Sequence, residues 1–317
     1  SLYNQYFHLF LEPNPNWIGH AYLTVLLLVF PPWLAEKVLL ISYLLLLPIS
    51  FRLLLNVLKF PSKVLSFFIF PFSYSFLLYY GFFNFCFGVA FLVLNLYLWK
   101  KYSTEKRDVK KWCILLVLSM ALYFSHLFTF LAFIVTALFW ELYTLFVEGE
   151  KTREYVKVFV FKLSILIIPI ILSIWYLCSH NVSDGDSVYL PFVDIATMFM
   201  KIQPAKGVEY GHENVFTQWI FYSILLICIN GVYNSIKDKS LQLNSNKIVL
   251  GITLIGCCIS IFVVPNKMDA AVGLVTYRLM MLFFIFLILI LAFIRMKRWL
   301  EVSILVIISY VNISLMI

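Results

Sequence analysis

The chain has 317 residues, of which 63% are hydrophobic and 13% charged, and its mean hydropathy is +0.94. Soluble domains carry about a quarter charged residues and about half apolar ones, so this composition excludes an ordinary soluble protein. An aromatic content of 19% excludes a disordered chain, and continuous apolar runs such as 38–47 and 279–292 argue against an outer-membrane barrel. Runs long enough to cross a bilayer core of about 30 Å recur along the chain, which predicts a polytopic membrane protein.

The net charge of +8 indicates how the chain is oriented in the membrane, whereas in a soluble protein it would suggest nucleic-acid binding. The basic residues form short clusters between apolar runs, where they normally set membrane orientation. We therefore expect a membrane-lipid environment and no nucleic-acid partner. The clusters lie in 100–111, 151–157, 237–247 and 295–298. The positive-inside rule places all four in the cytoplasm.

Apolar runs predict crossing helices over 17–35, 37–58, 81–99, 155–178, 216–236, 248–264, 278–294 and from 299 to the end. Arg52 and Lys162 fall inside two of these helices but within about two turns of an end, so snorkelling to the membrane surface explains them.

Two regions do not fit one crossing each. As a single helix, 112–147 would be about 54 Å long, which exceeds the bilayer, so we expect two helices with a break near Tyr123, Ser125 and His126. The segment 64–80 contains Pro71. It is predicted to be re-entrant or surface-lying, because the assigned orientation leaves both of its flanks outside.

The expected fold is an all-α transmembrane bundle of about ten crossing helices plus one re-entrant or interfacial segment. We expect a single transmembrane domain over 1–317. Its main loops are 1–16 (outer), 100–111 (cytoplasmic and basic), 179–215 (long and outer) and 237–247 (cytoplasmic). The longest is too short for a domain with its own core. Because the chain starts at Ser1 and stops in an apolar run, we expect it to be truncated at both ends.

Polar residues that loops do not explain gather at the predicted outer helix ends. The first group is Glu12-Pro13-Asn14-Pro15-Asn16-Trp17, in which two prolines hold an acid and two amides in an extended turn. His20 follows about one turn into the first helix. This arrangement can present a carboxylate to a ligand. It is equally explained if Asn16 caps the helix and Trp17 anchors it, and a lone histidine such as His20 is more often a structural residue.

Three further positions belong to the same outer side. Tyr80 precedes Gly81-Phe82-Phe83-Asn84, where an amide sits at an aromatic helix entrance. His126 lies at the expected break, and burying it in hydrocarbon is costly unless it meets water or a partner. Arg278 opens a late helix, where its guanidinium can bind a phosphate in bidentate fashion or snorkel to lipid head groups.

Several function classes are excluded by missing motifs. The sequence has no Walker loop, dinucleotide fingerprint, His-Glu-x-x-His, Gly-x-Ser-x-Gly or Cys-x-x-Cys pair. This argues against ATP-driven pumps, reductases, zinc proteases and serine hydrolases.

Taken together, several short motifs resemble bacterial glycosyltransferases of the GT-C type. They are the outer Pro-Asn-Pro-Asn segment, the stretch GFFNFCFG at 81–88, the basic cytoplasmic hairpin, the Ser125-His126 break and the helix that opens with Arg278. The resemblance implies transfer of a sugar from a polyprenyl-phosphate donor to a glycan, lipid or protein acceptor. Transfer would occur on the outer face of the bacterial cytoplasmic membrane. In that superfamily a carboxylate of the first outer loop acts as base or metal partner, so a divalent cation is the candidate cofactor.

The resemblance also implies roles for individual residues. Glu12 would be the base or orient the acceptor, and His20 and His126 would hydrogen-bond or transfer protons. The expected substrate-binding set is Asn14, Asn16, Tyr80, Asn84 and Arg278, with Asn84 contacting sugar and Arg278 holding the donor phosphate. The chain departs from the family's pattern, and we expect the first helix, the start of its outer loop and the acidic motif to lie upstream of Ser1. The alternatives are a transporter or flippase for a lipid-linked glycan, and a polysaccharide polymerase or ligase.

Overall fold

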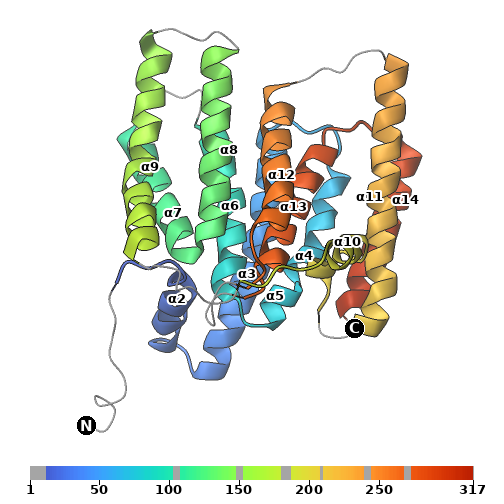
Figure 1. The fold of residues 1–317 in the computed structure, drawn as a ribbon, viewed down its shortest axis with the longest axis horizontal. Helices are drawn as coiled ribbons and strands as arrows, with labels where there is room; N and C mark the ends of the chain where they lie inside the picture. The colour runs from blue at the N-terminus through green and yellow to red at the C-terminus, as the bar shows by residue number, and fades with distance from the viewer. Residues whose placement is uncertain are drawn as a thin grey trace.

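The computed structural model describes residues 12–102, 108–147, 153–179, 187–207, 210–238, 244–267 and 273–316. Every named element in these ranges is a helix, and the helices form one bundle (Figure 1). They are α2 (Ile18–Leu27), α3 (Pro32–Val57), η1 (Val64–Ile69), α4 (Phe70–Ser73), α5 (Phe76–Tyr79), α6 (Phe83–Lys101), α7 (Val109–Ser125), α8 (Leu127–Phe146), α9 (Arg153–Ser179), α10 (Phe192–Met200), η2 (Gln203–Ala205), α11 (Tyr210–Asp238), α12 (Ser245–Val263), α13 (Val275–Leu291) and α14 (Arg298–Met316). The expected all-α class is confirmed.

Seven of these helices are long and apolar enough to cross a membrane: α3, α6, α8, α9, α11, α12 and α14. They indicate an integral membrane protein. The expected count of about ten crossings is not confirmed, because α7 and α13 have 17 residues each and α2 has 10.

The described residues that flank the predicted cytoplasmic loops gather at one end of the bundle, uppermost in Figure 1. There α6 ends at Lys101, α7 begins at Val109, and α13 is followed by Arg295. We call this the basic end. At the opposite end α6 begins, α7 meets α8, and α13 begins close to Arg278. We call this the Arg278 end.

The expected crossing helix over 17–35 is wrong. Helix α2 stops at Leu27, and α3 starts anew at Pro32, preceded by Pro31 in an extended conformation (ψ 152°). A proline pair prevents helix continuation, because proline lacks a backbone N–H and restricts the residue before it. At about 15 Å, α2 is too short to cross a bilayer and lies at the Arg278 end, where the Gly19 N–H donates to Asn84 Oδ1 (2.6 Å).

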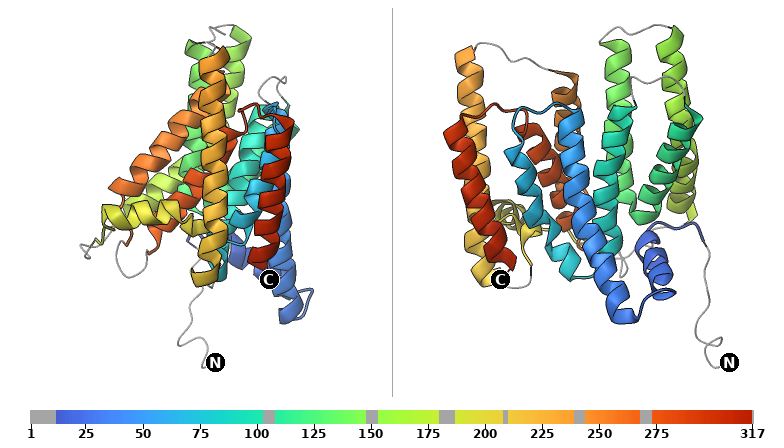
Figure 2. Two further views of the ribbon diagram at one scale, coloured as in Figure 1. Left: turned by 90° about the vertical axis from the view of Figure 1, so that its right-hand side faces the viewer. Right: turned by 180° about the vertical axis from the view of Figure 1, so that it is seen from behind.

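The segment 64–80 also differs from expectation. The Phe60 ring before it packs on Phe293 at the basic end, with ring centres 4.2 Å apart. The Phe82 ring after it lies against Arg278. The three short helices η1, α4 and α5 therefore run from one end to the other instead of returning to the same side (Figure 2). One expected crossing is lost at α2 and one is gained at 64–80, so the later loops keep the membrane sides that the sequence predicts for them.

The predicted break in 112–147 is confirmed. Helix α7 ends at Ser125 and α8 begins at Leu127, with His126 between them in an extended conformation (φ −166°, ψ 132°). The His126 side chain caps α8, because its Nδ1 accepts a hydrogen bond from the Phe128 backbone N–H (3.2 Å).

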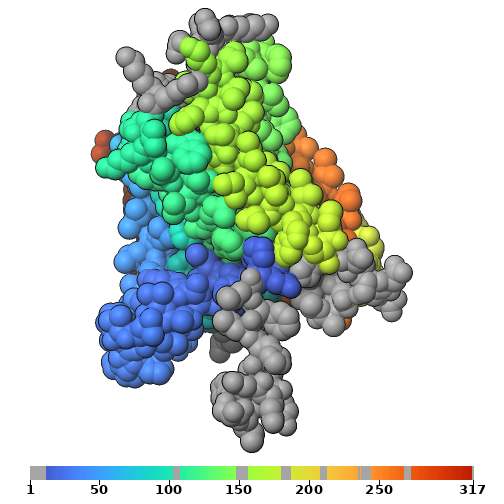
Figure 3. All heavy atoms as spheres, turned by 90° about the vertical axis from the view of Figure 1, so that its left-hand side faces the viewer, coloured from blue at the N-terminus to red at the C-terminus, as the bar shows by residue number. Residues whose placement is uncertain are grey.

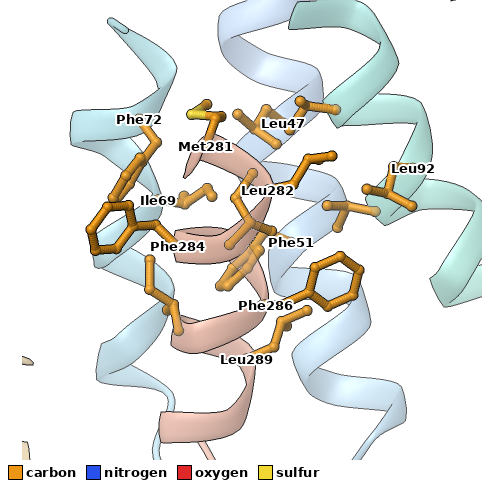
Figure 4. Close-up of a cluster of buried hydrophobic side chains, with 14 of the residues drawn as sticks. Leu47, Phe51, Ile69, Phe72, Leu92, Met281, Leu282, Phe284, Phe286 and Leu289 are labelled. Atoms are coloured by element: carbon orange, nitrogen blue, oxygen red, sulfur yellow. The ribbon is translucent and has the colours of Figure 1, made fainter. Parts of the chain in front are cut away.

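Most residues of α13 are buried, and its side chains form one apolar cluster with those of α3, η1, α4 and α6 (Figure 4). Phe51, Phe72 and Phe286 are almost fully buried there. The outer helices instead carry exposed apolar side chains. Helix α9 presents a broad face with exposed Val160, Ile167 and Ile171 (Figure 3), as expected for a surface that contacts lipid.

Candidate functional site

Arg278 and His126, which are 152 positions apart in sequence, meet inside the Arg278 end. Arg278 is 9% exposed and His126 is 5% exposed, and Arg278 Nη1 lies 3.4 Å from His126 Nε2. They come from two different elements of the fold. His126 is held in the α7–α8 turn, and Arg278 projects from the first turn of α13.

Two donors face each other in this pair. A backbone N–H can only donate, so the bond from Phe128 makes His126 Nδ1 an acceptor and places the ring proton on Nε2. The Arg278 guanidinium has donors only. The two side chains therefore cannot satisfy one another, and Arg278 Nε is also buried without a hydrogen-bond partner. An anionic acceptor that lies beside the pair could accept from both donors.

The walls of the site are aromatic. The Arg278 guanidinium carbon lies 4.6 Å from the centre of the Phe82 ring, a cation–π contact. The Phe85 ring stands edge-on to His126, with centres 5.0 Å apart and planes at 88°. In the described part of the chain, no salt bridge pairs Arg278 with a carboxylate. A guanidinium that is removed from water without a counter-charge is costly, which strengthens its demand for an anion.

Gly88 lets α6 approach the turn that carries His126. A Cβ at this position would lie 2.6 Å from Thr129 Oγ1 and 3.2 Å from His126 Cβ. A larger residue would push the α7–α8 turn away from α6. Gly88 thus positions His126 without touching Arg278 in any described contact.

The N-terminal segment is fastened beside this site. The Asn84 amide donates from Nδ2 to the Asn16 carbonyl (2.7 Å) and accepts at Oδ1 from the Gly19 N–H. The Tyr123 hydroxyl donates to the Pro13 carbonyl (2.7 Å), and the Trp17 N–H donates to the Phe124 carbonyl (2.7 Å). Asn84 therefore holds the start of α2 against α6, and both ends of its amide are engaged.

The remaining predicted site residues lie apart from the Arg278–His126 pair. Glu12 is exposed and accepts from Asn14 Nδ2 (3.2 Å). Asn16 is exposed with a positive φ of 72°, and it is not the helix cap, which is Trp17. His20 is exposed, as is Tyr80, whose ring packs on Phe76. Within the described ranges no hydrogen bond joins these four to Arg278 or His126.

Sequence reasoning missed the contributions of Phe82, Phe85 and Gly88. A signal was present, because Phe85 lies three residues from both of the others and helical neighbours at that spacing share a face. Only the structure reveals that this face meets His126 and Arg278.

Comparison of the chain with family models, curated proteins and solved structures finds no match. Among the described residues, no group of three His, Cys, Asp or Glu side chains is placed to hold a metal ion. The argument for function therefore depends on the site itself.

Proposed function

We propose that the protein is a membrane glycosyltransferase that binds the phosphate of a polyprenyl-phosphate-linked sugar beside the Arg278–His126 pair. The observation that carries the proposal is the buried pair of facing donors, in which Arg278 Nη1 lies 3.4 Å from His126 Nε2. A phosphate supplies acceptor oxygens for both groups and the negative charge that Arg278 lacks. The aromatic walls and the surrounding apolar helices suit a lipid-linked donor.

The proposed reaction is transfer with phosphate as the leaving group. An acceptor hydroxyl attacks the anomeric carbon, its proton passes to a base, and the bond between that carbon and the phosphate oxygen breaks. Arg278 and His126 donate to the phosphate as its charge develops, which lowers the barrier. Glu12 is the proposed base, on a segment fastened through Pro13 and Trp17. We propose that the site faces outward across a bacterial cytoplasmic membrane, because the basic end is then cytoplasmic.

The test is transfer of labelled sugar from a polyprenyl-phosphate donor by membranes that contain the whole chain. Arg278→Ala should lower transfer by about 10²–10³-fold, the usual cost of losing one preorganised donor to developing charge. Arg278→Lys should restore only part of it, because an ammonium cannot bind bidentately. Arg298→Ala removes an exposed arginine at the basic end and serves as the matched control. Undiminished transfer by Arg278→Ala, at equal membrane abundance, would reject the role.

A transporter or flippase for a lipid-linked glycan is the second candidate. It is favoured by one observation: in the described ranges, no carboxylate touches Arg278 or His126. A transporter predicts that a labelled lipid-linked substrate becomes accessible from both membrane faces without forming a new glycosidic bond. A transferase predicts bond formation on one face.

A further inference from the structure

A second polar site lies beside the first turn of α13. A cavity of about 390 Å³ opens between this turn and the segment formed by α10 and η2. Its volume falls in the range of small-ligand sites, about 300–1,000 Å³. Tyr277 contributes to its wall, while the next residue, Arg278, contacts His126. Two consecutive residues of α13 thus serve two different sites.

The cavity presents hydrogen-bonding groups with unused capacity. Gln203 is 8% exposed, yet its side-chain amide makes no hydrogen bond within the described ranges. Asn266 Oδ1 accepts from the Thr276 N–H (3.2 Å), which leaves its Nδ2 free to donate. Thr197 Oγ1 donates to the Val193 carbonyl (2.8 Å) and keeps lone pairs to accept. The Gln203 amide lines the cavity, so it can donate to and accept from a ligand there.

The mixture of groups selects the class of ligand. Asp194 adds a carboxylate to the wall, which repels a phosphate. The amide N–H groups of Gln203 and Asn266 add donors, which a metal cation would leave unused. A hydroxyl group satisfies both kinds of partner, because it donates to Asp194 and accepts from an amide N–H.

The rest of the wall fits the same ligand. Leu190, Met198 and Leu274 supply apolar surface, and Tyr277 supplies an aromatic ring with a hydroxyl. The Tyr277 ring is held in place by stacking on Phe76, with centres 4.9 Å apart and planes at 24°. Sugars combine apolar ring faces with hydroxyl edges, which matches a wall that alternates apolar and polar groups.

We propose that this cavity binds a neutral sugar. Gln203, Asn266 and Asp194 would bind its hydroxyl groups, and Leu274 and Tyr277 would contact its ring. The further role of this sugar as the hydroxyl-bearing acceptor rests on the proposed function, since it requires the phosphate of the donor to lie at Arg278. Sugar binding itself does not require it.

The experiment measures binding of methyl α-glucoside, methyl α-mannoside and methyl α-galactoside to the whole purified chain by saturation-transfer NMR. The detergent should be an amine oxide, because maltoside head groups would compete. At least one glycoside should bind to the unaltered chain. Gln203→Leu should weaken it by about tenfold, the cost of one lost hydrogen bond. Asp194→Asn should weaken it by about tenfold as well, because a hydrogen bond to a charged acceptor is stronger than one to a neutral amide oxygen. Glu301→Gln on α14, which does not line the cavity, is the control.

The outcomes separate the two proposals. If no glycoside binds, or if both cavity variants bind as tightly as the control, the sugar site is rejected even where transfer is intact. Asp194 is exposed, so Asp194→Asn tests the site without risk to the core. If Arg278→Ala still binds the glycoside and the unaltered chain transfers no sugar, the cavity stands and the transferase function fails.

Discussion

Basic side chains at the Arg278 end differ in how their charge is satisfied. In the described part of the chain Arg278 contacts no carboxylate, whereas Lys206, which is 1% exposed, donates from Nζ to Asn214 Oδ1. The pKa of Lys206 is lowered to about 8, mainly by burial and also by the nearby positive charge of Lys201, while Glu213 opposes the shift. Lys206 thus already has a neutral partner, while Arg278 still requires an anion.

The depressed pKa of Lys206 predicts a pH dependence of stability. Between about pH 8 and the ordinary lysine pKa near 10.4, the unfolded chain binds more protons at this position than the folded chain does. The contribution of Lys206 to the free energy of unfolding should therefore rise with pH across this window and stay constant below it. Thermal unfolding in detergent, compared between the unaltered chain and Lys206→Met, isolates this contribution.

Lys201→Gln provides the control for the cause of that shift. Removing the neighbouring positive charge should raise the pKa of Lys206 and move the start of the stability rise to higher pH. Identical pH profiles for the unaltered chain and Lys206→Met would contradict the assignment.

Site residues can be predicted from the sequence where burying a charged or polar side chain in an apolar run costs free energy. Arg278 and His126 were both predicted because a charged or polar group in an apolar run needs a partner. Their mutual contact was not predicted, since one residue lies in a turn and the other in a helix 152 positions away. The roles proposed for Glu12 and His20 remain predictions, and the structure places both on the surface.

At the scale of elements, a buried ion pair joins α8 to α9. Lys162 Nζ lies 2.6 Å from Glu141 Oε1, and their side chains are 4% and 5% exposed. Trp99 of α6 donates from Nε1 to the same oxygen (2.8 Å). The expectation that Lys162 snorkels to the surface is wrong, because sequence shows distance from a helix end but not which helix face is buried. The pair ties three helices together near the basic end.

A double-mutant cycle measures the coupling free energy between Glu141 and Lys162. Glu141→Gln or Lys162→Met alone removes the opposite charge from one buried group and should lower the free energy of unfolding by about 3–5 kcal/mol. The double variant should cost less than the sum of the two, because neither charge remains, and Gln still offers an acceptor to Trp99. Thermal unfolding in detergent gives all four values.

The chain supplies a matched exposed pair for comparison. Lys111 Nζ lies 3.7 Å from Asp108 Oδ2, with side chains 33% and 42% exposed. The same cycle at this pair should yield a coupling of about 0–1 kcal/mol, because solvent screens it. Equal coupling at the two pairs would show that burial does not strengthen the Glu141–Lys162 pair.

A helix boundary can be predicted where an apolar run is longer than one bilayer crossing. The break at His126 followed from a run too long for one bilayer crossing, and the structure confirms it. The break before Pro32 was missed, although Pro31 and Pro32 stand side by side in the sequence. Such a break cannot be seen in the mean hydropathy of an apolar run, because hydropathy does not show that proline lacks the backbone N–H that a helix needs.

At the scale of the whole molecule, exposed apolar surface and charge together define how the bundle sits in a membrane. On α3, Ile41, Leu45 and Ile49 are exposed at four-residue spacing, which gives one continuous apolar face. Such a face is expected to contact lipid. The concentration of basic residues at one end then predicts which end is cytoplasmic.

Two positions at opposite ends of the bundle test that orientation. Cys178 is exposed near the end of α9, at the Arg278 end, and Val109 is exposed at the start of α7, at the basic end. In intact cells, a membrane-impermeant maleimide should label Cys178. In a chain carrying Val109→Cys, Cys113→Ala and Cys178→Ala, it should label only after permeabilisation. The buried thiols of Cys86 and Cys257 should stay unlabelled in both cases.

The labelling result also constrains the proposed chemistry, because orientation decides which substrates can reach Arg278. If only position 109 is labelled in intact cells, the bundle is inverted and the Arg278 end faces the cytoplasm. Transfer on the outer face would then be excluded, even though the facing donors of Arg278 and His126 would still require an anion. If Cys178 alone is labelled, the Arg278–His126 site and the sugar cavity both open on the side where an outer-face transferase needs them.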